Sequence, residues 1–449
     1  MAMKWKKTDL FLHDDTEPSV KISTGLLTAF GKSSFPRVCN LGIGRNSVKA
    51  RLVIINDSSS FLSVSRSALP VPDEMAGGRS LFVSVRRDSI AIGPLFAVLI
   101  GSGSSKESVS LPNMEDYCRE LADYCRNAGC LFYLFSLKDW QDGYVNGWIL
   151  RDGSWRKASM PYPDAVHNRV HQRKSELSLN FIALEEKMKQ AGIPFFNSRF
   201  LNKWEVHEWL SDDPVLLPYL PASAKLTSKR DYQNYTRSYS DFFIKPVYGS
   251  QGKKIFRFRE TEDGYWLDDT SSAGGPLLFR EAEDAFTYMH PRLTKEPYLL
   301  QETIRIQKYR GKPLDFRILC HKKEEGWTVT SMTARVSAEN SFVSNLYQGG
   351  AAYPVKKVLT ELYGDRKARH IRKMLAELSE EVCLAIDRKG CFGELGIDLT
   401  VDEDERIWLI EVNSKPSKNS EYVMDGPKIR PSAKAVADYG MYLSMVNGV

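Results

Sequence analysis

The pattern of apolar and polar positions changes along the chain and divides it into three regions. Up to about residue 100, short apolar runs alternate with Ser-, Gly- and Pro-rich turns, which predicts a small β-rich domain. The Ser/Gly stretch at residues 101–110 predicts a linker. Beyond it, apolar residues at helical spacing alternate with continuous apolar runs, which predicts α/β units. We therefore expect three domains, at residues 1–105, 106–198 and 199–449.

Two stretches refine this picture of the second and third domains. An amphipathic helix is predicted at residues 175–191, and a short apolar strand should follow it at residues 193–196. From residue 241 onward, strands dominate in hairpin-like pairs, interrupted by one long amphipathic helix at about residues 366–388. The predicted fold class is therefore α+β rather than a doubly wound parallel sheet.

Composition and charge exclude several classes of protein. The chain has 449 residues, of which 42% are hydrophobic and 26% charged, so it should fold as a globular protein without long disordered tracts. The net charge of +6 is too small to indicate a nucleic-acid partner. The basic residues Arg169, Arg173 and Lys174 are predicted to form a solvated helix face.

Cysteine content and the apolar runs bear on where the protein works. Seven cysteines without a CxxC pair argue against a disulfide framework and against a zinc ribbon. The N-terminus carries positive charge with no apolar segment behind it, so export is not expected. The longest apolar run, at residues 90–100, is far shorter than the ~20 residues that span a bilayer. We expect a cytoplasmic protein with no membrane partner, in which this run is a buried strand.

A glycine-bearing hairpin is the first candidate for binding phosphate. An apolar strand ends in Lys245, enters a turn at residues 249–252 and leaves through a second strand. Small residues let backbone amides approach phosphate oxygens, and a lysine adds a charge-assisted hydrogen bond. An ordinary β-hairpin with a solvated lysine fits the same residues. This loop alone leaves both interpretations open.

Two C-terminal apolar runs separated by an acidic turn predict a second hairpin. We expect Val401 to face Arg406 across that turn. Asp398 would then lie opposite Leu409 and diagonal to Glu411. The pairing therefore brings two acidic side chains near each other.

The same hairpin is a candidate metal site. Side chains alternate along a strand, so Asp398, Glu411 and Asn413 should converge on one face. Hard oxygen ligands suit Mg²⁺, whereas zinc prefers nitrogen or sulfur. The alternative is a solvent-facing acidic strand pair. The apolar run directly before Glu411 favours the metal, because a lone carboxylate in a buried strand is costly.

A third predicted strand pair carries two arginines. Its strands start at about Leu314 and Trp327 and pair across a turn at residues 322–326. The side chains that should share one face, unless a bulge alters the register, are Asp315, Arg317, Thr333 and Arg335. Two inward arginines suit phosphate. An exposed charged face fits these residues equally well.

Taken in order, these segments resemble an ATP-grasp domain. The matching stretches are Asn202-Lys203, IKPVYGSQGKKI, LLQETI, the DFRI and TARV strands, SNLYQGGAA, GIDL and IEVNSKP. The resemblance is closest to the ribosomal-protein glutamate ligases, for SNLYQGGAA, and to the YheC/YheD endospore coat-associated family, which also accounts for PDAVHNRVHQRKSE. It implies an ATP-grasp fold preceded by an α/β pre-ATP-grasp domain and a small N-terminal β-rich domain.

The resemblance also implies roles for individual positions. Two lysines would hold phosphates under a mobile glycine lid, and residues 301–304 would form the adenine-binding hinge. The cofactor-binding positions are Lys203, Lys245, Gly249, Ser250, Gly252, Gln301, Glu302, Thr303, Ile304 and Asp315. The catalytic positions, near the transferred phosphoryl group and the acyl phosphate, are Arg317, Arg335 and Asn345. Asp398, Glu411 and Asn413 would bind one or two Mg²⁺ ions, with Mn²⁺ as the alternative ion.

The function implied by the resemblance is ATP- and Mg²⁺-dependent ligation of a carboxylate to an amine through an acyl phosphate. No stretch matches an amino-acid substrate pocket, so the carboxylate and the amine are not identified. The alternative is an endospore coat-associated structural or interaction protein that binds ATP without ligating. Association with the spore coat and its proteins is implied by the second family alone. His167 and His171 have the spacing of a zinc pair on a helix but lack a third ligand, and they suit the family pattern better.

Overall fold

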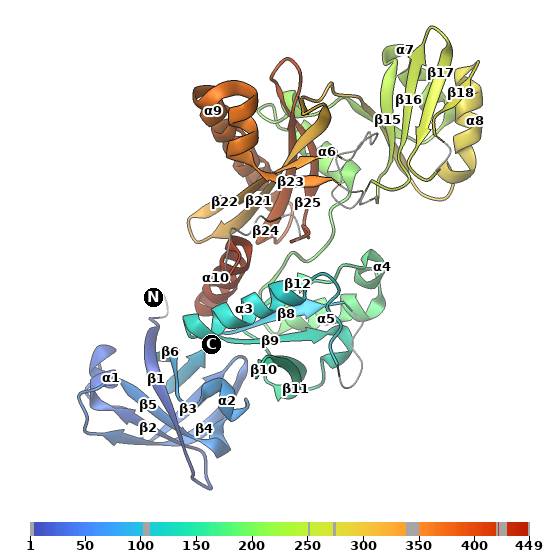
Figure 1. Ribbon diagram of the computed structural model, residues 1–449. Helices are drawn as coiled ribbons and strands as arrows, with labels where there is room; N and C mark the ends of the chain where they lie inside the picture. Colours follow the sequence, from blue (N-terminus) through green and yellow to red (C-terminus); the bar gives the residue numbers. More distant parts are fainter. Residues whose placement is uncertain are drawn as a thin grey trace.

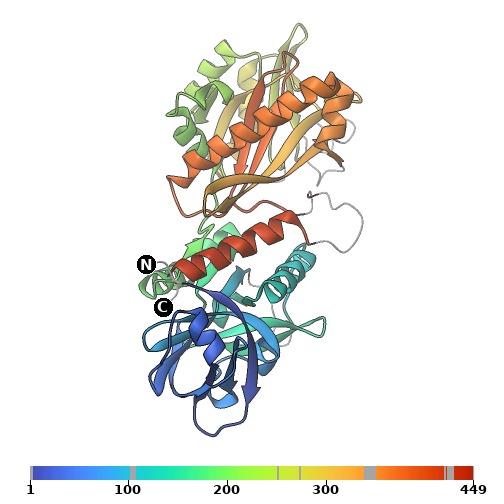
Figure 2. The ribbon, with the colours of Figure 1, turned by 90° about the vertical axis from the view of Figure 1, so that its left-hand side faces the viewer.

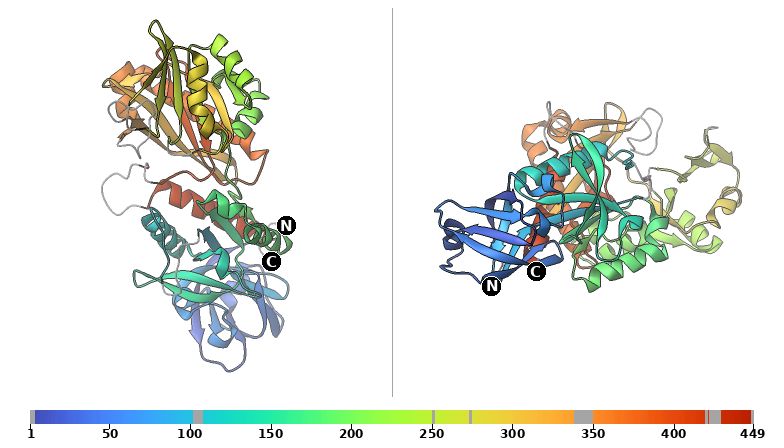
Figure 3. Two further views of the ribbon diagram at one scale, coloured as in Figure 1. Left: turned by 90° about the vertical axis from the view of Figure 1, so that its right-hand side faces the viewer. Right: turned by 90° about the horizontal axis from the view of Figure 1, so that it is seen from below.

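The described residues form four β-sheets in the order of the chain, and the last helix returns to the second of them (Figure 1). The computed structural model describes residues 4–101, 108–249, 252–272, 275–337, 350–418, 421 and 429–447. Seen from below, the N-terminal sheet and the third sheet lie at opposite ends of the molecule (Figure 3). Among the described residues, none of the helices combines the length and the apolar character needed to cross a bilayer.

The first sheet is a closed barrel in the strand order β1-β5-β2-β4-β3-β7-β6. Its inward positions alternate with exposed ones, and Leu10, Val20 and Val83 are fully buried inside it. The small β-rich domain predicted at the N-terminus is confirmed as this barrel. Its elements are β1 (Lys6–His13), β2 (Ser19–Ser23), α1 (Thr24–Ala29), β3 (Val38–Ile43), β4 (Asn46–Ile55), β5 (Phe61–Ser65), α2 (Asp73–Ala76), β6 (Arg79–Val85) and β7 (Ser89–Gly93).

The second sheet has the order β11-β10-β9-β8-β12-β13 and forms the central layer. Its middle strand, β8 (Leu95–Ile100), is buried on both faces, as expected of a parallel strand covered on two sides. The apolar run at residues 90–100 is therefore two strands, because Pro94 separates β7 of the barrel from β8. The other strands are β9 (Leu131–Ser136), β10 (Val145–Arg151), β11 (Ser154–Met160), β12 (Ala165–Arg169) and β13 (Phe195–Phe196).

Helices from distant parts of the sequence cover the central layer. The C-terminal helix α10 (Pro431–Asn447) lies beside α3 (Glu115–Ala128) on this layer (Figure 2). The prediction of a single helix at residues 175–191 is wrong in detail. The segment is divided into α4 (Arg173–Glu176) and α5 (Leu179–Gln190), because the Ser178 side chain caps α5 by accepting a hydrogen bond from the backbone of Phe181. The predicted division into three domains stays a prediction.

The third sheet, in the order β14-β19-β15-β16-β17-β18, packs against α7 (Lys229–Ser238) and α8 (Ala282–Leu293). Aromatic side chains fill the space between them, with Tyr232, Phe242 and Phe258 fully buried and in mutual contact. The strands are β14 (Ser223–Leu226), β15 (Asp241–Pro246), β16 (Phe256–Thr261), β17 (Gly264–Asp269), β18 (Leu277–Phe279) and β19 (Tyr298–Glu302).

The fourth sheet has the order β23-β22-β21-β24-β25 and packs against α9 (Val355–Asp387) and α6 (Lys203–Ser211). The long helix predicted at residues 366–388 is confirmed as the second part of α9, which a break at Gly364 divides. The third and fourth sheets are antiparallel with helices packed against them, so the α+β class is confirmed. The strands are β20 (Lys308–Tyr309), β21 (Lys312–Lys323), β22 (Gly326–Val336), β23 (Ala351–Pro354), β24 (Glu394–Val401) and β25 (Ile407–Asn413).

Candidate functional site

A cleft lies between the third and fourth sheets. Its walls come from α6 and β25 on one side and from β15 and β19 on the other. The apolar residues that line it are Leu201, Val206, Leu210, Leu220, Pro221, Leu299, Leu409, Ile410 and Val412, and the charged or amide side chains are Lys203, Lys245, Gln301 and Glu411. An apolar slot with a few convergent polar groups is the usual form of a small-molecule site. Its volume is about 50 Å³.

Lys245 projects into this cleft from the end of β15. Its Nζ donates a hydrogen bond of 2.6 Å to Oε1 of Gln301 on the neighbouring strand β19. Desolvation and the charge of nearby Lys203 together lower the pKa of Lys245 to about 8, against the opposing effect of Glu411. The structure thus brings together four of the predicted residues, and it favours the cleft over the solvated hairpin for Lys245.

Lys203 enters the cleft from the first turn of α6. Its Nζ donates to the carbonyl oxygen of Gly249 at 2.6 Å and to Oε1 of Glu411 at 2.9 Å. One lysine therefore connects the predicted glycine lid to a predicted metal ligand on β25. The Asn202 side chain fixes the start of α6 by accepting a hydrogen bond from the backbone of Glu205.

The predicted hinge, residues 301–304, begins at the end of β19 and lies along the edge of the cleft. Gln301 contacts Lys245 through Oε1 and donates from Nε2 to Ser223. The Glu302 carboxylate accepts a hydrogen bond of 2.7 Å from the backbone of Ala222, so it ties β19 to the start of β14. Thr303 donates to Asp241. Ile304 follows directly after this tied segment.

The predicted register of the C-terminal hairpin is wrong. Val401 lies opposite Ile407 rather than opposite Arg406, a shift of one residue, and a bulge between Asp398 and Leu399 adds a second residue on β25. Asp398 therefore lies directly opposite Glu411 rather than opposite Leu409, so Glu411 faces it instead of lying diagonal to it. Asn413 lies two pairs further along, and its Nδ2 is 3.5 Å from Asp398 Oδ2.

The face shared by Asp315, Arg317, Thr333 and Arg335 is confirmed by the pairing of β21 with β22. Both arginines are nearly buried and bind carboxylates. Arg335 donates two hydrogen bonds to Asp315, at 2.6 and 2.5 Å, and lies 3.1 Å from Asp398. Arg317 holds Asp398 from the other side with two hydrogen bonds. Burial raises the pKa of Asp398, but the two arginines outweigh it and hold the pKa below its usual value.

Three oxygen-bearing side chains therefore lie on adjacent strands, although one is engaged by arginine. Glu411 and Asn413 are the more accessible of them, and Asp398 is buried. Within the described part of the chain, no group of three His, Cys, Asp or Glu side chains is spaced to hold a metal ion. The predicted metal-binding roles of Asp398, Glu411 and Asn413 stay predictions.

Some predicted positions lie outside the described residues. These are Ser250 in the glycine turn and Asn345 in the SNLYQGGAA stretch. Gly252 lies at the described end of the glycine turn, with φ of 68°. The predicted roles of all these residues stay predictions.

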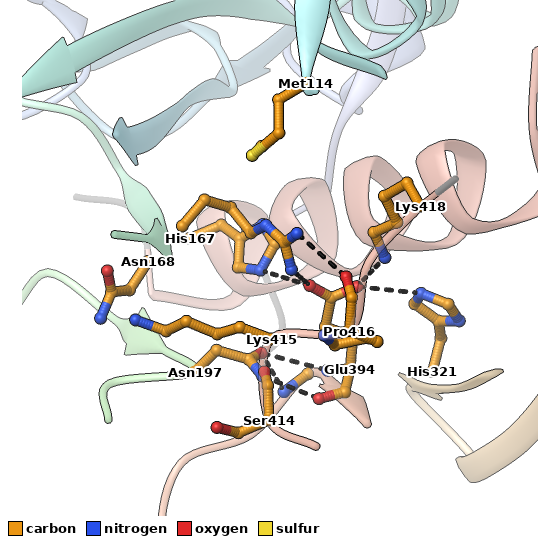
Figure 4. Close-up of polar contacts among 12 residues, drawn as sticks. Met114, His167, Asn168, Asn197, His321, Glu394, Ser414, Lys415, Pro416 and Lys418 are labelled. Carbon is orange, nitrogen blue, oxygen red and sulfur yellow. Dashed lines mark hydrogen bonds and ion pairs between the residues drawn. The ribbon is translucent and has the colours of Figure 1, made fainter. Parts of the chain in front are cut away.

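A buried ionic cluster centred on Glu394 joins the central layer to the fourth sheet (Figure 4). Glu394, at the start of β24, accepts hydrogen bonds from Arg169 on β12 and from Lys418 beyond β25. His167 and His321 approach the same carboxylate, at 3.3 and 3.5 Å. All five side chains are buried. This carboxylate thus holds together segments from three parts of the chain.

Charge and burial compete within the Glu394 cluster. Burial would raise the pKa of Glu394, but Lys418 and Arg169 outweigh it and hold the pKa well below its usual value. Burial lowers the pKa of His167 to about 4, so this imidazole is neutral near pH 7. His167 lies in a strand, so the helical zinc pair with His171 does not form.

The sequence did not identify this cluster. Arg169 was assigned to a solvated face, and that prediction is wrong, because its side chain is buried against Glu394. A signal was present, since Glu394 opens a fully buried strand and Arg169 closes another. A charged residue in an apolar strand requires a partner. Nothing in the sequence shows which partner that is.

A larger cavity, of about 270 Å³, lies between the barrel and the central layer, away from the cleft. Met75 and Phe132 contribute apolar surface, and Arg126 and Arg151 lie at its rim. Arg151 is paired with Glu74, another residue of the lining. This cavity contains none of the residues predicted for the nucleotide site.

Comparison with known proteins found a matching family and two similar relatives. A model of the family described as YheC/D like ATP-grasp matches residues 192–443. The endospore coat-associated protein YheD of Bacillus subtilis (strain 168) is 27% identical over 346 residues, which cover 75% of this chain and 76% of that protein. The endospore coat-associated protein YheC of the same organism is 23% identical over 320 residues, covering 70% of this chain and 88% of that protein.

Solved structures resemble the chain at lower similarity. D-cycloserine synthetase DcsG aligns with a TM-score of 0.47 and 14% identity, covering 77% of this chain and 99% of that chain. The D-alanine-D-alanine ligase from Coxiella burnetii aligns with a TM-score of 0.45 and 11% identity, covering 78% and 95%. Similarity at this level does not identify a substrate.

Proposed function

Because the chain belongs to the YheC/D-like ATP-grasp family, as its motifs predicted, we propose that it is an ATP- and Mg²⁺-dependent ligase joining a carboxylate to an amine. The observation that carries the proposal is the cleft between the third and fourth sheets. Lys203, Lys245 and Glu411 meet there at the end of an apolar slot. Cations suit phosphate, and an apolar slot suits a purine ring.

In this proposal the adenine lies against the apolar wall of the cleft, beside the backbone of residues 301–304. Lys203 and Lys245 bind phosphate oxygens, and Gly249, Ser250 and Gly252 belong to the lid above them.

The donor set of the C-terminal hairpin fits Mg²⁺ in its chemistry. Glu411, Asn413 and Asp398 offer hard oxygens on neighbouring strands, and phosphate oxygens and water would supply the remaining ligands. Mg²⁺, when bound, would neutralise negative charge on the phosphates. The chain's own contribution is to hold these side chains in place, with Arg317 and Arg335 fixing the carboxylate of Asp398.

The proposed reaction needs no protein nucleophile. A substrate carboxylate oxygen attacks the γ-phosphorus of ATP, the bond from that phosphorus to the β–γ bridging oxygen breaks, and ADP leaves. The nitrogen of an amine then attacks the acyl carbon of the resulting acyl phosphate. It loses a proton to solvent, and inorganic phosphate departs with the electron pair of the carbon–oxygen bond. Catalysis then rests on positioning and charge neutralisation, for which Arg317, Arg335 and Asn345 are the proposed residues.

Calorimetry with Mg-ATP tests the site assignment. We expect Lys245→Ala and Glu411→Ala each to abolish or greatly weaken Mg-ATP binding while the protein keeps its circular dichroism spectrum. Lys373→Ala is a matched control, because Lys373 is 72% exposed on α9. Unchanged nucleotide affinity in both cleft variants would refute the assignment.

A second candidate function follows from the two relatives YheD and YheC, which are named as endospore coat-associated proteins. The chain would then bind Mg-ATP as part of an assembly at the spore coat, together with coat proteins, and perform no ligation. A screen of carboxylates and amines for ADP release separates the two functions. Release of ADP that depends on both substrates favours the ligase, whereas thermal stabilisation by Mg-ATP without turnover favours the coat-associated role.

A further inference from the structure

Four cations lie in the seam between the central layer and the fourth sheet, and they differ in how they are paired. Arg169 and Lys418 share Glu394, and Lys415 is paired with Glu176. The fourth cation, Arg173, has no carboxylate within ion-pair distance among the residues that the structure describes. A partly buried guanidinium without a directly paired carboxylate suits an anionic ligand.

The backbone that carries Arg173 is held firmly. Arg173 opens the short helix α4, and Glu176 closes it. The Glu176 carboxylate accepts hydrogen bonds from the Asn168 side chain, from the backbone of Phe200 and from Lys415. These bonds tie α4 to the segments that precede α6 and follow β25. Glu176 lies one helical turn after Arg173, at i+3, so its bonds hold Arg173 close to the fourth sheet.

The guanidinium of Arg173 is itself fixed in orientation. It lies over the ring of Phe200 at 5.3 Å and over the ring of Tyr248 at 4.8 Å. Its Nη2 donates a hydrogen bond of 2.9 Å to the carbonyl oxygen of Leu201. Its Nη1 is buried and has no hydrogen-bond partner. A donor left unpaired in this way is costly, so the arrangement is complete only when an acceptor arrives.

The contacts of Arg173 lead directly to the nucleotide cleft. Leu201 lines that cleft, and Tyr248 immediately precedes Gly249, whose carbonyl oxygen binds Lys203. Desolvation lowers the pKa of Arg173, and Glu411 is among the nearby anionic groups that raise it, so the guanidinium lies within electrostatic reach of the proposed metal ligand. The guanidinium is therefore linked to the cleft through Leu201 and Tyr248, two of the residues that it contacts.

We propose that Arg173 binds the γ-phosphate of the nucleotide, so that the central layer supplies a cation to a site otherwise built from the third and fourth sheets. This inference rests on the proposed function of the cleft. The planar fork of arginine matches two phosphate oxygens, and its contacts with two aromatic rings orient it before the ligand arrives. Because ADP lacks the γ-phosphate, Arg173 should discriminate between the two nucleotides.

The test compares Mg-AMPPNP, a non-hydrolysable ATP analogue, with Mg-ADP by calorimetry on the full-length protein. We expect Arg173→Ala to weaken Mg-AMPPNP binding by roughly 10- to 100-fold, the range of a charge-assisted hydrogen bond, and to change Mg-ADP binding by less than about 3-fold. Arg173→Lys should recover part of the loss, because it keeps the charge without the fork. Lys174→Ala, which removes an exposed cation from the same helix, should change neither affinity.

Each other outcome overturns the inference. An equal loss of both nucleotides in Arg173→Ala would mean that the residue supports the lid or the fold, and a Mg-AMPPNP affinity within 3-fold of wild type would mean that it does not touch the ligand. Melting curves of each variant identify any loss caused by unfolding. If the wild-type protein binds neither nucleotide, the proposed function fails as well, whereas wild-type binding with no discrimination by Arg173→Ala refutes this inference alone.

Discussion

Replacing Glu394 by alanine should destabilise the protein more than a change at any exposed acidic residue. Glu394 is fully buried and receives hydrogen bonds from Arg169 and Lys418, which are buried themselves. The substitution removes the negative charge and leaves both cations in place. Arg169 keeps a hydrogen bond to the carbonyl oxygen of Pro416, but no other ion pair of Lys418 is seen among the described residues.

The expected loss follows from the fate of these cations. Removing one partner of a buried ion pair costs about 3–5 kcal/mol, because the remaining charge is not solvated. Lys418 can limit that cost by losing its proton. An amine with the ordinary pKa of 10.5 is deprotonated at pH 7 at a cost of roughly 5 kcal/mol, at about 1.4 kcal/mol for each pH unit. We therefore expect Glu394→Ala to lower the free energy of unfolding by about 3–5 kcal/mol.

Chemical denaturation followed by circular dichroism and by tryptophan fluorescence measures this loss. The two probes together show whether the layers unfold in one step, which a chain with several sheets need not do. Glu377→Ala is the matched control, because Glu377 forms an exposed ion pair with Lys373 on α9. Its removal should change the free energy of unfolding by less than about 0.5 kcal/mol.

A double variant separates charge from packing. Arg169→Met combined with Glu394→Ala removes one of the stranded cations, so it should be more stable than Glu394→Ala alone. If Glu394→Ala is destabilised by less than about 1 kcal/mol, the buried cluster does not hold the layers together as described. The same conclusion would follow if the added Arg169→Met made the protein still less stable.

Two further predictions concern the cleft and the C-terminal helix. Desolvation lowers the pKa of Lys245 from 10.5 to about 8, so Mg-ATP affinity should fall as the pH rises through 8, whereas Lys245→Arg should remove this dependence; calorimetry between pH 7 and 9.5 checks both. By the same shift the folded protein releases this proton before the unfolded chain does, so stability should rise with pH between 8 and 10.5. A Cβ at Gly440 would lie 2.5 Å from the ring of Phe96, so Gly440→Ala should destabilise the docking of α10 by about 1–3 kcal/mol. A Cβ at Gly101 would have no atom within 4 Å, so Gly101→Ala should not be destabilising. Thermal melting of the two variants checks this pair.

Local patterns in the sequence were sufficient for much of the fold. Alternating apolar positions predicted the N-terminal strands, and the closed barrel confirms them. Errors arose where the signal was only a few residues long. The run at residues 90–100 was taken as one strand although Pro94 divides it, and the cap at Ser178 that separates α4 from α5 was missed.

The candidate site shows the same division between local and distant information. The shared face of Asp315, Arg317, Thr333 and Arg335 followed from strand period alone, because a two-residue repeat fixes which side chains lie together. The predicted pairing of Asp398 with Leu409 is wrong for two reasons: the turn places Val401 opposite Ile407 rather than Arg406, and a bulge adds one more residue, which leaves little trace in the sequence.

The sequence by itself determined the family, the α+β class and the residue types offered to a nucleotide, because ordered motifs and short-period patterns are properties of neighbouring residues. The tertiary structure decided which charges are paired. Lys203 with Glu411, Arg169 with Glu394 and the unmatched guanidinium of Arg173 depend on contacts between segments up to 225 residues apart. The free energy of a buried charge depends on the partner within a few ångströms, and chain proximity does not reveal that partner.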